Sequence, residues 1–159
     1  MNKGDKVKKD GGIFNIFKGD TRKNSSTNLE DTGYLTNGLK GNFVMTPRIG
    51  PLELGMTSAV HRPGQSMQPH AHPNSSETLI AFRGSGEFFL KDRWIPVKEG
   101  DIIYAPPCVK HGSNNPENNV ENLIVVGIGI PPQEDLYKRA NYEPDGDDKD
   151  YITKIHIHE

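Results

Sequence analysis

The sequence predicts an all-β protein with one compact domain, and three observations lead to this prediction. The chain has 159 residues, and at about 150 residues per domain this length allows one domain. From Tyr34 onward, short runs of β-favouring residues recur about every ten residues, separated by Gly, Pro and Asn. No part of this region shows a convincing helical period. Many short strands at even spacing are typical of a sandwich or a barrel.

Each expected strand ends where the chain supplies a turn. The sequence Arg62-Pro63-Gly64 closes one strand, and Gly84-Ser85-Gly86 offers the positive φ that a tight connection needs. Pro131-Pro132 ends the last strand, and residues 133–140 follow as one short helix with acidic residues first and basic residues last. The expected strands are Asn42–Thr46, Met56–Arg62, Ser66–His70, Thr78–Arg83, Gly86–Lys91, Trp94–Val97, Asp101–Ala105, His111–Asn115 and Glu121–Ile130.

The two ends of the chain differ from the middle in composition. Residues 1–30 are polar and carry seven Lys or Arg against four Asp or Glu. Their one apolar run, Ile13–Phe17, is short enough to dock as an added or exchanged strand. Residues 141–159 carry two basic against six acidic side chains. We therefore expect a polar N-terminal leader at 1–30, a barrel at 31–135 and an acidic C-terminal tail at 136–159.

The composition also excludes several classes of protein. No stretch approaches the roughly 18 uninterrupted apolar residues of a membrane helix, and no apolar run of signal-peptide length follows the Lys-rich start. The single cysteine, Cys108, excludes an internal disulfide framework and a multi-cysteine zinc site. A net charge of −2 gives no general reason to expect nucleic-acid binding. We expect a cytoplasmic protein that binds neither membranes nor nucleic acids.

Two compact clusters in the middle of the chain carry residues typical of a metal site. On a strand, His70 and His72 point to the same face, and a short loop returns the chain so that Glu77 begins the next strand. His111 supplies a third imidazole from a distant part of the sequence. Three nitrogens and one carboxylate oxygen, with room for water, describe an open catalytic-type metal centre. These residue types suit Fe, Mn, Ni, Zn and Cu alike, so the sequence does not choose the ion.

The two clusters resemble the two conserved motifs of the cupin superfamily. The first motif is glycine, five residues, His-x-His, three or four residues, Glu, six residues and glycine. The second is glycine, five residues, Pro-x-Gly, two residues, His, three residues and Asn. Cys108 stands where the second motif has glycine, and this is the one departure. The matching positions are Gly64, His70, His72, Glu77 and Gly84 in the first motif, and Gly100, Pro106, His111 and Asn115 in the second.

The resemblance covers residues 64–115 and implies a double-stranded β-helix, the cupin or jelly-roll barrel. It implies one divalent transition metal ion inside the barrel, bound by the three histidines and Glu77, and it implies a homodimer. The function expected first is that of a metal-dependent enzyme that oxidises a small polar metabolite, as a dioxygenase does. Two alternatives stay open: a metal-dependent isomerase or lyase, and a non-enzymatic cupin that binds a small ligand or a metal.

Further candidate site residues follow from strand alternation. Besides Glu77, the candidates for a catalytic role are His61, Arg83 and Tyr104. Alternation places Arg83 on the face of Glu77, and it allows His61 and Tyr104 to reach the cavity. Guanidinium groups pair bidentately with carboxylates. The candidate anchors for an anionic substrate are Arg48, Arg62 and Arg83.

Three more residues with metal-binding side chains are expected to lie outside the site. Cys108 is interpreted as a small turn residue close to the metal centre, with a fifth-ligand or reactive-thiol role as the alternative. His156 and His158 alternate in the last residues of the chain, where a β-like tail is the preferred interpretation.

Overall fold

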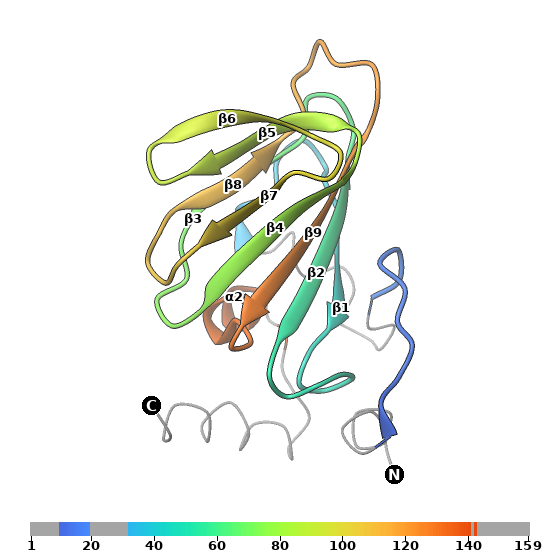
Figure 1. The fold of residues 1–159 in the computed structure, drawn as a ribbon, viewed down its shortest axis with the longest axis vertical. Coiled ribbons are helices and arrows are strands. Elements are labelled where there is room, and N and C mark those ends of the chain that lie inside the picture. Colours follow the sequence, from blue (N-terminus) through green and yellow to red (C-terminus); the bar gives the residue numbers. More distant parts are fainter. Residues whose placement is uncertain (1–9, 20–31, 141, 143–159) are drawn as a thin grey trace.

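The computed structural model describes residues 10–19, 32–140 and 142, and these residues form two antiparallel sheets that pack face to face (Figure 1). His156, His158 and most of the two end segments lie outside the described residues. A short helix, α2, follows the last strand. The elements are β1 (Gly41–Met45), β2 (Gly55–His61), β3 (Ser66–His70), β4 (Ser76–Arg83), β5 (Ser85–Leu90), β6 (Arg93–Lys98), β7 (Ile102–Ala105), β8 (His111–Asn114), β9 (Leu123–Ile130) and α2 (Glu134–Arg139).

The strand order is that of a double-stranded β-helix, as the sequence predicted. One sheet has the order β1-β2-β9-β4-β7 and the other has the order β3-β8-β5-β6. Strands far apart in the sequence therefore lie side by side: β9 pairs with both β2 and β4, and β8 pairs with β3. This pairing places His70 directly opposite His111, and it places Glu77 between Ala105 and Gly129.

The core lies between the two sheets, and a second apolar cluster joins α2 to the barrel. Phe88 from the smaller sheet packs with Leu79 and Val125 from the larger sheet, and all three are buried. Burying each such side chain contributes about 1.5–3 kcal/mol. In the second cluster, Tyr137 packs on Phe43 of β1. The packed part of the chain therefore continues beyond residue 135, where the sequence placed the end of the barrel.

The apolar run near the N-terminus contacts the barrel but does not form a strand. Ser58 of β2 donates a hydrogen bond from Oγ to the carbonyl of Ile16, and the described segment 10–19 lies beside β1 and β2 in Figure 1. Ile13 is 97% exposed. Within one chain, Ile13–Phe17 therefore does not dock as an added strand, because the run makes local contacts without a ladder of backbone pairs. Its exchange between two chains stays a prediction.

In the part of the chain that the structure describes, no helix is both long enough and apolar enough to cross a membrane.

Candidate metal centre

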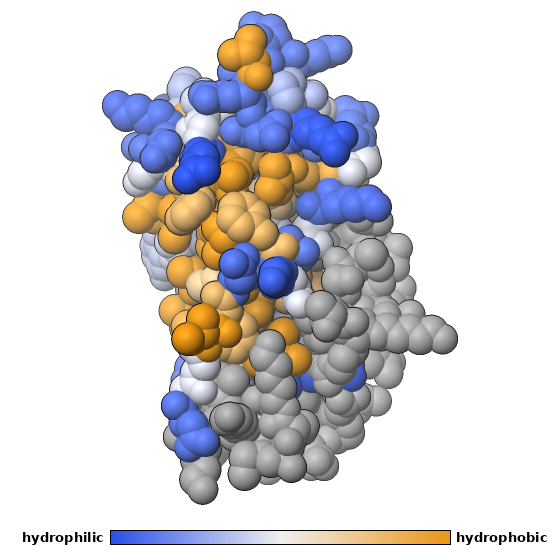
Figure 2. Space-filling model, turned by 90° about the vertical axis from the view of Figure 1, so that its right-hand side faces the viewer, coloured by the Kyte–Doolittle hydropathy of each residue, from blue (hydrophilic) through white to orange (hydrophobic). Residues whose placement is uncertain are grey.

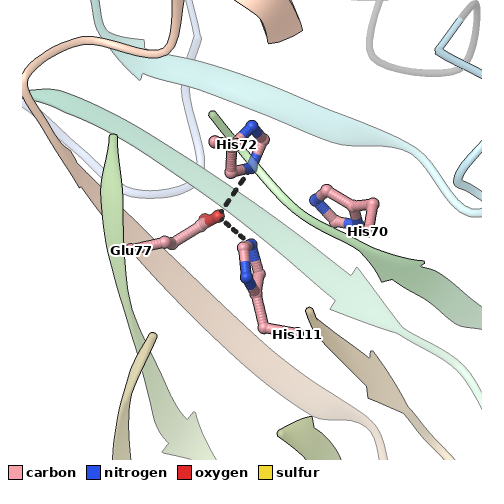
Figure 3. A group of neighbouring side chains, drawn as sticks. All are labelled: His70, His72, Glu77 and His111. Carbon is pink, nitrogen blue, oxygen red and sulfur yellow. Dashed lines mark hydrogen bonds and ion pairs between the residues drawn. The ribbon is translucent and has the colours of Figure 1, made fainter. Parts of the chain in front are cut away.

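Four buried side chains converge at one end of the space between the sheets (Figure 3). His70 ends β3 and His72 follows two residues later, Glu77 is the second residue of β4, and His111 is the first residue of β8. One ligand atom from each residue can be chosen so that all four atoms lie within 4.8 Å of one another. The arrangement that the sequence predicted for these four residues is therefore present, and they could hold a metal ion.

The three imidazoles are oriented so that each turns Nε2 toward the centre. His70 Nδ1 is 2.7 Å from the carbonyl of Gln68, and His111 Nδ1 is 2.9 Å from the carbonyl of Val109. His72 Nδ1 is 2.7 Å from Asp135 Oδ2. Each Nδ1 therefore donates its proton to an acceptor, and each Nε2 faces the centre. A bound ion would there replace the hydrogen bonds that His72 and His111 make to Glu77. This donor set fits a divalent transition metal.

Glu77 collects three hydrogen bonds on one carboxylate oxygen. Its Oε2 lies 2.6 Å from His111 Nε2 and 3.1 Å from His72 Nε2, and it accepts from Gln133 Nε2 at 2.9 Å. Burial opposes the charged carboxylate, but the hydrogen bonds from His111 and His72 outweigh it and hold the pKa of Glu77 well below its usual range. The carboxylate is therefore ionised and ready to act as an anionic ligand.

The histidines differ in charge because their surroundings differ. Burial lowers the pKa of His70 to about 4, so this ring is neutral near pH 7. Burial also disfavours the charged form of His72, but its hydrogen bonds to Asp135 and Glu77 are stronger and raise its pKa to about 9. Binding an ion at His72 would therefore release a proton from Nε2.

Three contacts at this centre were not expected from the sequence, and all come from the flanks of the barrel. Asp135 and Gln133 lie at the start of α2 and contact His72 and Glu77. Tyr34 stacks on His70, with ring centroids 4.2 Å apart and planes inclined by 13°. Asp135 was visible in the sequence only as an acidic residue in the first turn of a helix. Nothing in its spacing indicates a contact with a residue 63 positions earlier.

His61 faces the interior of the barrel, as the sequence allowed. Its side chain is fully buried and lines a small pocket together with Glu77. Its Nε2 lies 2.8 Å from Ser113 Oγ. Burial lowers the pKa of His61 to about 4, so the ring is neutral near pH 7.

Tyr104 and Arg83 do not reach the interior of the barrel, and the candidate arginines lie away from the pocket beside Glu77. Tyr104 is 59% exposed, because the register with β4 places it opposite Thr78, an outward position. The pairing of β4 with β9 is irregular between Ala81 and Arg83, and this β-bulge breaks the alternation that placed Arg83 inside, so Arg83 is exposed. Arg62 is exposed too. None of Arg48, Arg62 and Arg83 lines the pocket beside Glu77.

Cys108 is an exposed turn residue beside the centre. Its backbone N–H donates to the carbonyl of His72 at 2.8 Å. Its φ is +67°, the left-handed conformation that glycine adopts without strain. Gly64, Gly84 and Gly100 also have positive φ. Cys108 occupies the position where the second motif has glycine, and its backbone thus keeps the conformation of glycine. Cys108 does not belong to the group of described residues that could hold a metal.

Comparison with known proteins agrees with this architecture. The Cupin domain family matches residues 59–127, which include all four converging residues. This chain belongs to the cupin superfamily. The cupin is 34% identical over 92 residues to Protein SchB from Streptomyces halstedii, an alignment that covers 54% of this chain and 66% of that protein. The chain thus spans slightly less than two thirds of the length of this relative.

Solved structures show the same fold at lower identity. KdgF from Halomonas sp. is 20% identical with a TM-score of 0.53, over 62% of this cupin and 84% of that chain. A predicted oxalate decarboxylase from Thermotoga maritima is 15% identical with a TM-score of 0.57, over 76% of this cupin and 99% of that chain. At these identities, the likeness establishes the fold alone.

Proposed function

We propose that this cupin is a metal-dependent enzyme that acts on a small polar molecule at a mononuclear centre formed by His70, His72, Glu77 and His111. One observation carries the proposal. Three imidazoles with their Nδ1 atoms already hydrogen-bonded converge with a buried carboxylate. Three nitrogens and one oxygen would fill four positions of an ion, so an ion that takes five or six ligands would keep positions open for a substrate.

Oxidation by O2 is the reaction class we propose. A bound redox-active ion would supply electron transfer, whereas a redox-inactive ion would supply only Lewis acidity. The protein's own contribution is to hold Glu77 ionised through His72, His111 and Gln133. It also buries the centre next to a pocket, where electrostatic interactions are weakly screened.

Metal loading and oxygen uptake test this proposal. Protein freed of metal and reconstituted anaerobically with Fe(II) should bind about one equivalent of iron per chain. It should then consume O2 in the presence of its substrate, which is sought in a collection of small metabolites. Zn(II) should bind to the same site but leave O2 untouched, because it has no redox chemistry. Glu77→Gln should weaken binding of the ion and abolish turnover. Glu87→Gln is the matched control, since Glu87 accepts from Asn114 and does not belong to the converging group.

The outcomes separate the possible functions. Product formation with Zn(II) in the absence of O2 would replace oxidation by isomerase or lyase chemistry. Saturable ligand binding without product would identify a binding module. Full metal occupancy in all four single alanine variants of the centre would overturn the proposed ligand set.

We also propose that the cupin forms a homodimer through the outer face of the larger sheet. Exposed apolar side chains gather on one face of the molecule between hydrophilic ones (Figure 2). Contiguous exposed apolar surface often marks an association site. The large exposed apolar residues on β2, β4, β7 and β9 form the set that we call the outer apolar patch: Val60, Phe82, Ile102, Tyr104 and Ile130.

A further inference from the structure

His70 is the histidine of the centre that Glu77 does not hold. Within the described part of the chain, Glu77 Oε2 is hydrogen-bonded to His72 and His111, and His70 lies beside this group without a bond to it (Figure 3). The hydrogen bond that His70 makes is the one from Nδ1 to the carbonyl of Gln68, in its own strand. A hydrogen bond tolerates considerable bending. This one contact therefore leaves the plane of the His70 ring loosely defined.

Tyr34 supplies a constraint on that plane. Its ring stacks on the imidazole of His70, with centroids 4.2 Å apart and planes inclined by 13°. Stacked aromatic pairs are favourable beyond the area that they bury. The backbone joins the same two residues, because the N–H of Gln68 donates to the carbonyl of Tyr34 at 2.7 Å and the carbonyl of Gln68 accepts from His70. The ring of Tyr34 is therefore in place to fix the orientation of His70.

Arg139 in turn holds Tyr34 from the end of α2. Its Cζ lies over the Tyr34 ring, 4.5 Å from the centroid, and a cation over the face of an aromatic ring is attracted to it. Its Nε and Nη2 donate to the carbonyl of Thr32 at 3.2 and 2.9 Å. Thr32 Oγ1 accepts from the N–H of Tyr34 at 3.2 Å. The guanidinium thus contacts the Tyr34 ring and also binds the turn that carries it.

We propose that Tyr34 is a positioning residue of the metal centre, which holds the imidazole of His70 in the plane where Nε2 faces the ion, and that Arg139 holds Tyr34. This inference rests on the proposed function, because it takes His70 to be a ligand. His72 and His111 are oriented by hydrogen bonds of their own. Loss of the Tyr34 ring should therefore release His70 alone, and the ion should stay bound by the other ligands.

Two measurements on the full-length protein test this assignment, with Zn(II) as the probe. In the unmodified protein, Zn(II) should shift the ring 15N resonances of His70, His72 and His111. In Tyr34→Leu the shifts of His72 and His111 should remain, whereas that of His70 should be lost or strongly reduced. Competition with a chromogenic chelator should show about tenfold weaker binding of Zn(II), the upper range for one aromatic pair. Tyr34→Phe keeps the ring and should keep the shift of His70 and the affinity within about twofold.

A second variant removes the support of the ring without opening the core. Arg139 is exposed, and Arg139→Gln should weaken Zn(II) binding by about threefold, as expected for a cation–π contact at an exposed site. The same substitution should have no further effect in Tyr34→Leu, because both changes act through one ring. Lys138→Gln is the matched control, since Lys138 is the neighbouring exposed cation and pairs with Glu134.

Phe89→Leu is the control for the loss of an aromatic ring. Phe89 also packs on another ring, that of Trp94 at 5.3 Å, and neither residue belongs to the converging group. This variant should bind Zn(II) with unchanged affinity and should keep the shifts of all three histidines.

The results distinguish failure of the positioning role from failure of the centre. An unmodified protein that binds no Zn(II) would overturn the proposed function and the inference with it. Zn(II) bound by Tyr34→Leu with an unchanged shift of His70, or with unchanged affinity, would overturn the inference alone. Equal loss of the shifts of all three histidines would indicate a general structural role and would also overturn it. If Tyr34→Leu does not fold, Arg139→Gln decides, because an affinity equal to that of Lys138→Gln would overturn the inference.

Discussion

Replacing Asp135 by Asn should weaken metal binding at a distance from the ligands themselves. Asp135 Oδ2 lies 2.7 Å from His72 Nδ1, and the His72 side chain is fully buried whereas that of Asp135 is 29% exposed. The carboxylate fixes the ring orientation and makes Nε2 more basic. Loss of such a partner typically costs 10–100-fold in metal affinity. Asn keeps an acceptor oxygen but loses the charge, so we expect about a tenfold loss, or about 1.4 kcal/mol. Asp135→Ala removes the acceptor and should approach a hundredfold loss.

Competition for Zn(II) against a chromogenic chelator measures these affinities. The matched control is Glu134→Gln, which removes the same charge from the same turn of α2, where Glu134 pairs with Lys138 at 2.9 Å. This control should bind Zn(II) with the affinity of the unmodified protein. If Asp135→Asn and Glu134→Gln gave the same affinity, the contact with His72 would have no part in binding the ion.

Three further predictions concern stability and assembly. Because burial lowers the pKa of His61 to about 4, the unfolded chain takes up a proton near pH 6.5 that the folded chain binds only near pH 4. This group should therefore cost the metal-free protein about 3 kcal/mol of stability across this window, and His70 acts in the same direction, so His61→Phe should reduce the slope of stability against pH in urea titrations by about the His61 share. Cys108→Gly should keep or raise the melting temperature, because glycine adopts φ +67° without strain. Cys108→Val should lower the free energy of unfolding by about 1–3 kcal/mol, and equal melting temperatures for the two variants would refute the strain argument. Double substitution of Ile102 and Tyr104 by Lys should convert a dimer to a monomer in light scattering, and a dimer that persists would place the interface elsewhere.

Local patterns in the sequence were sufficient to predict the strands and to bring three of the four candidate ligands together. Alternation along a strand places His70 and His72 on one side, and the turn that follows returns Glu77 to them, because both features depend only on nearby residues. His111 was harder to place from geometry alone, and its position came from the resemblance of residues 100–115 to a known motif. That these residues bind a metal stays a prediction.

Tertiary structure alone decided what surrounds the ligands. Asp135 contacts His72, and Ser113 contacts His61, through side chains 63 and 52 residues apart in the chain, so no local period could indicate either pair. Arg83 was misplaced because one β-bulge between β4 and β9 reverses the direction of the side chains that follow it. Bulges and side-chain contacts between distant elements arise from the packing of two sheets and a helix. Alternation in the sequence reports which face a strand buries, but not what is buried against it.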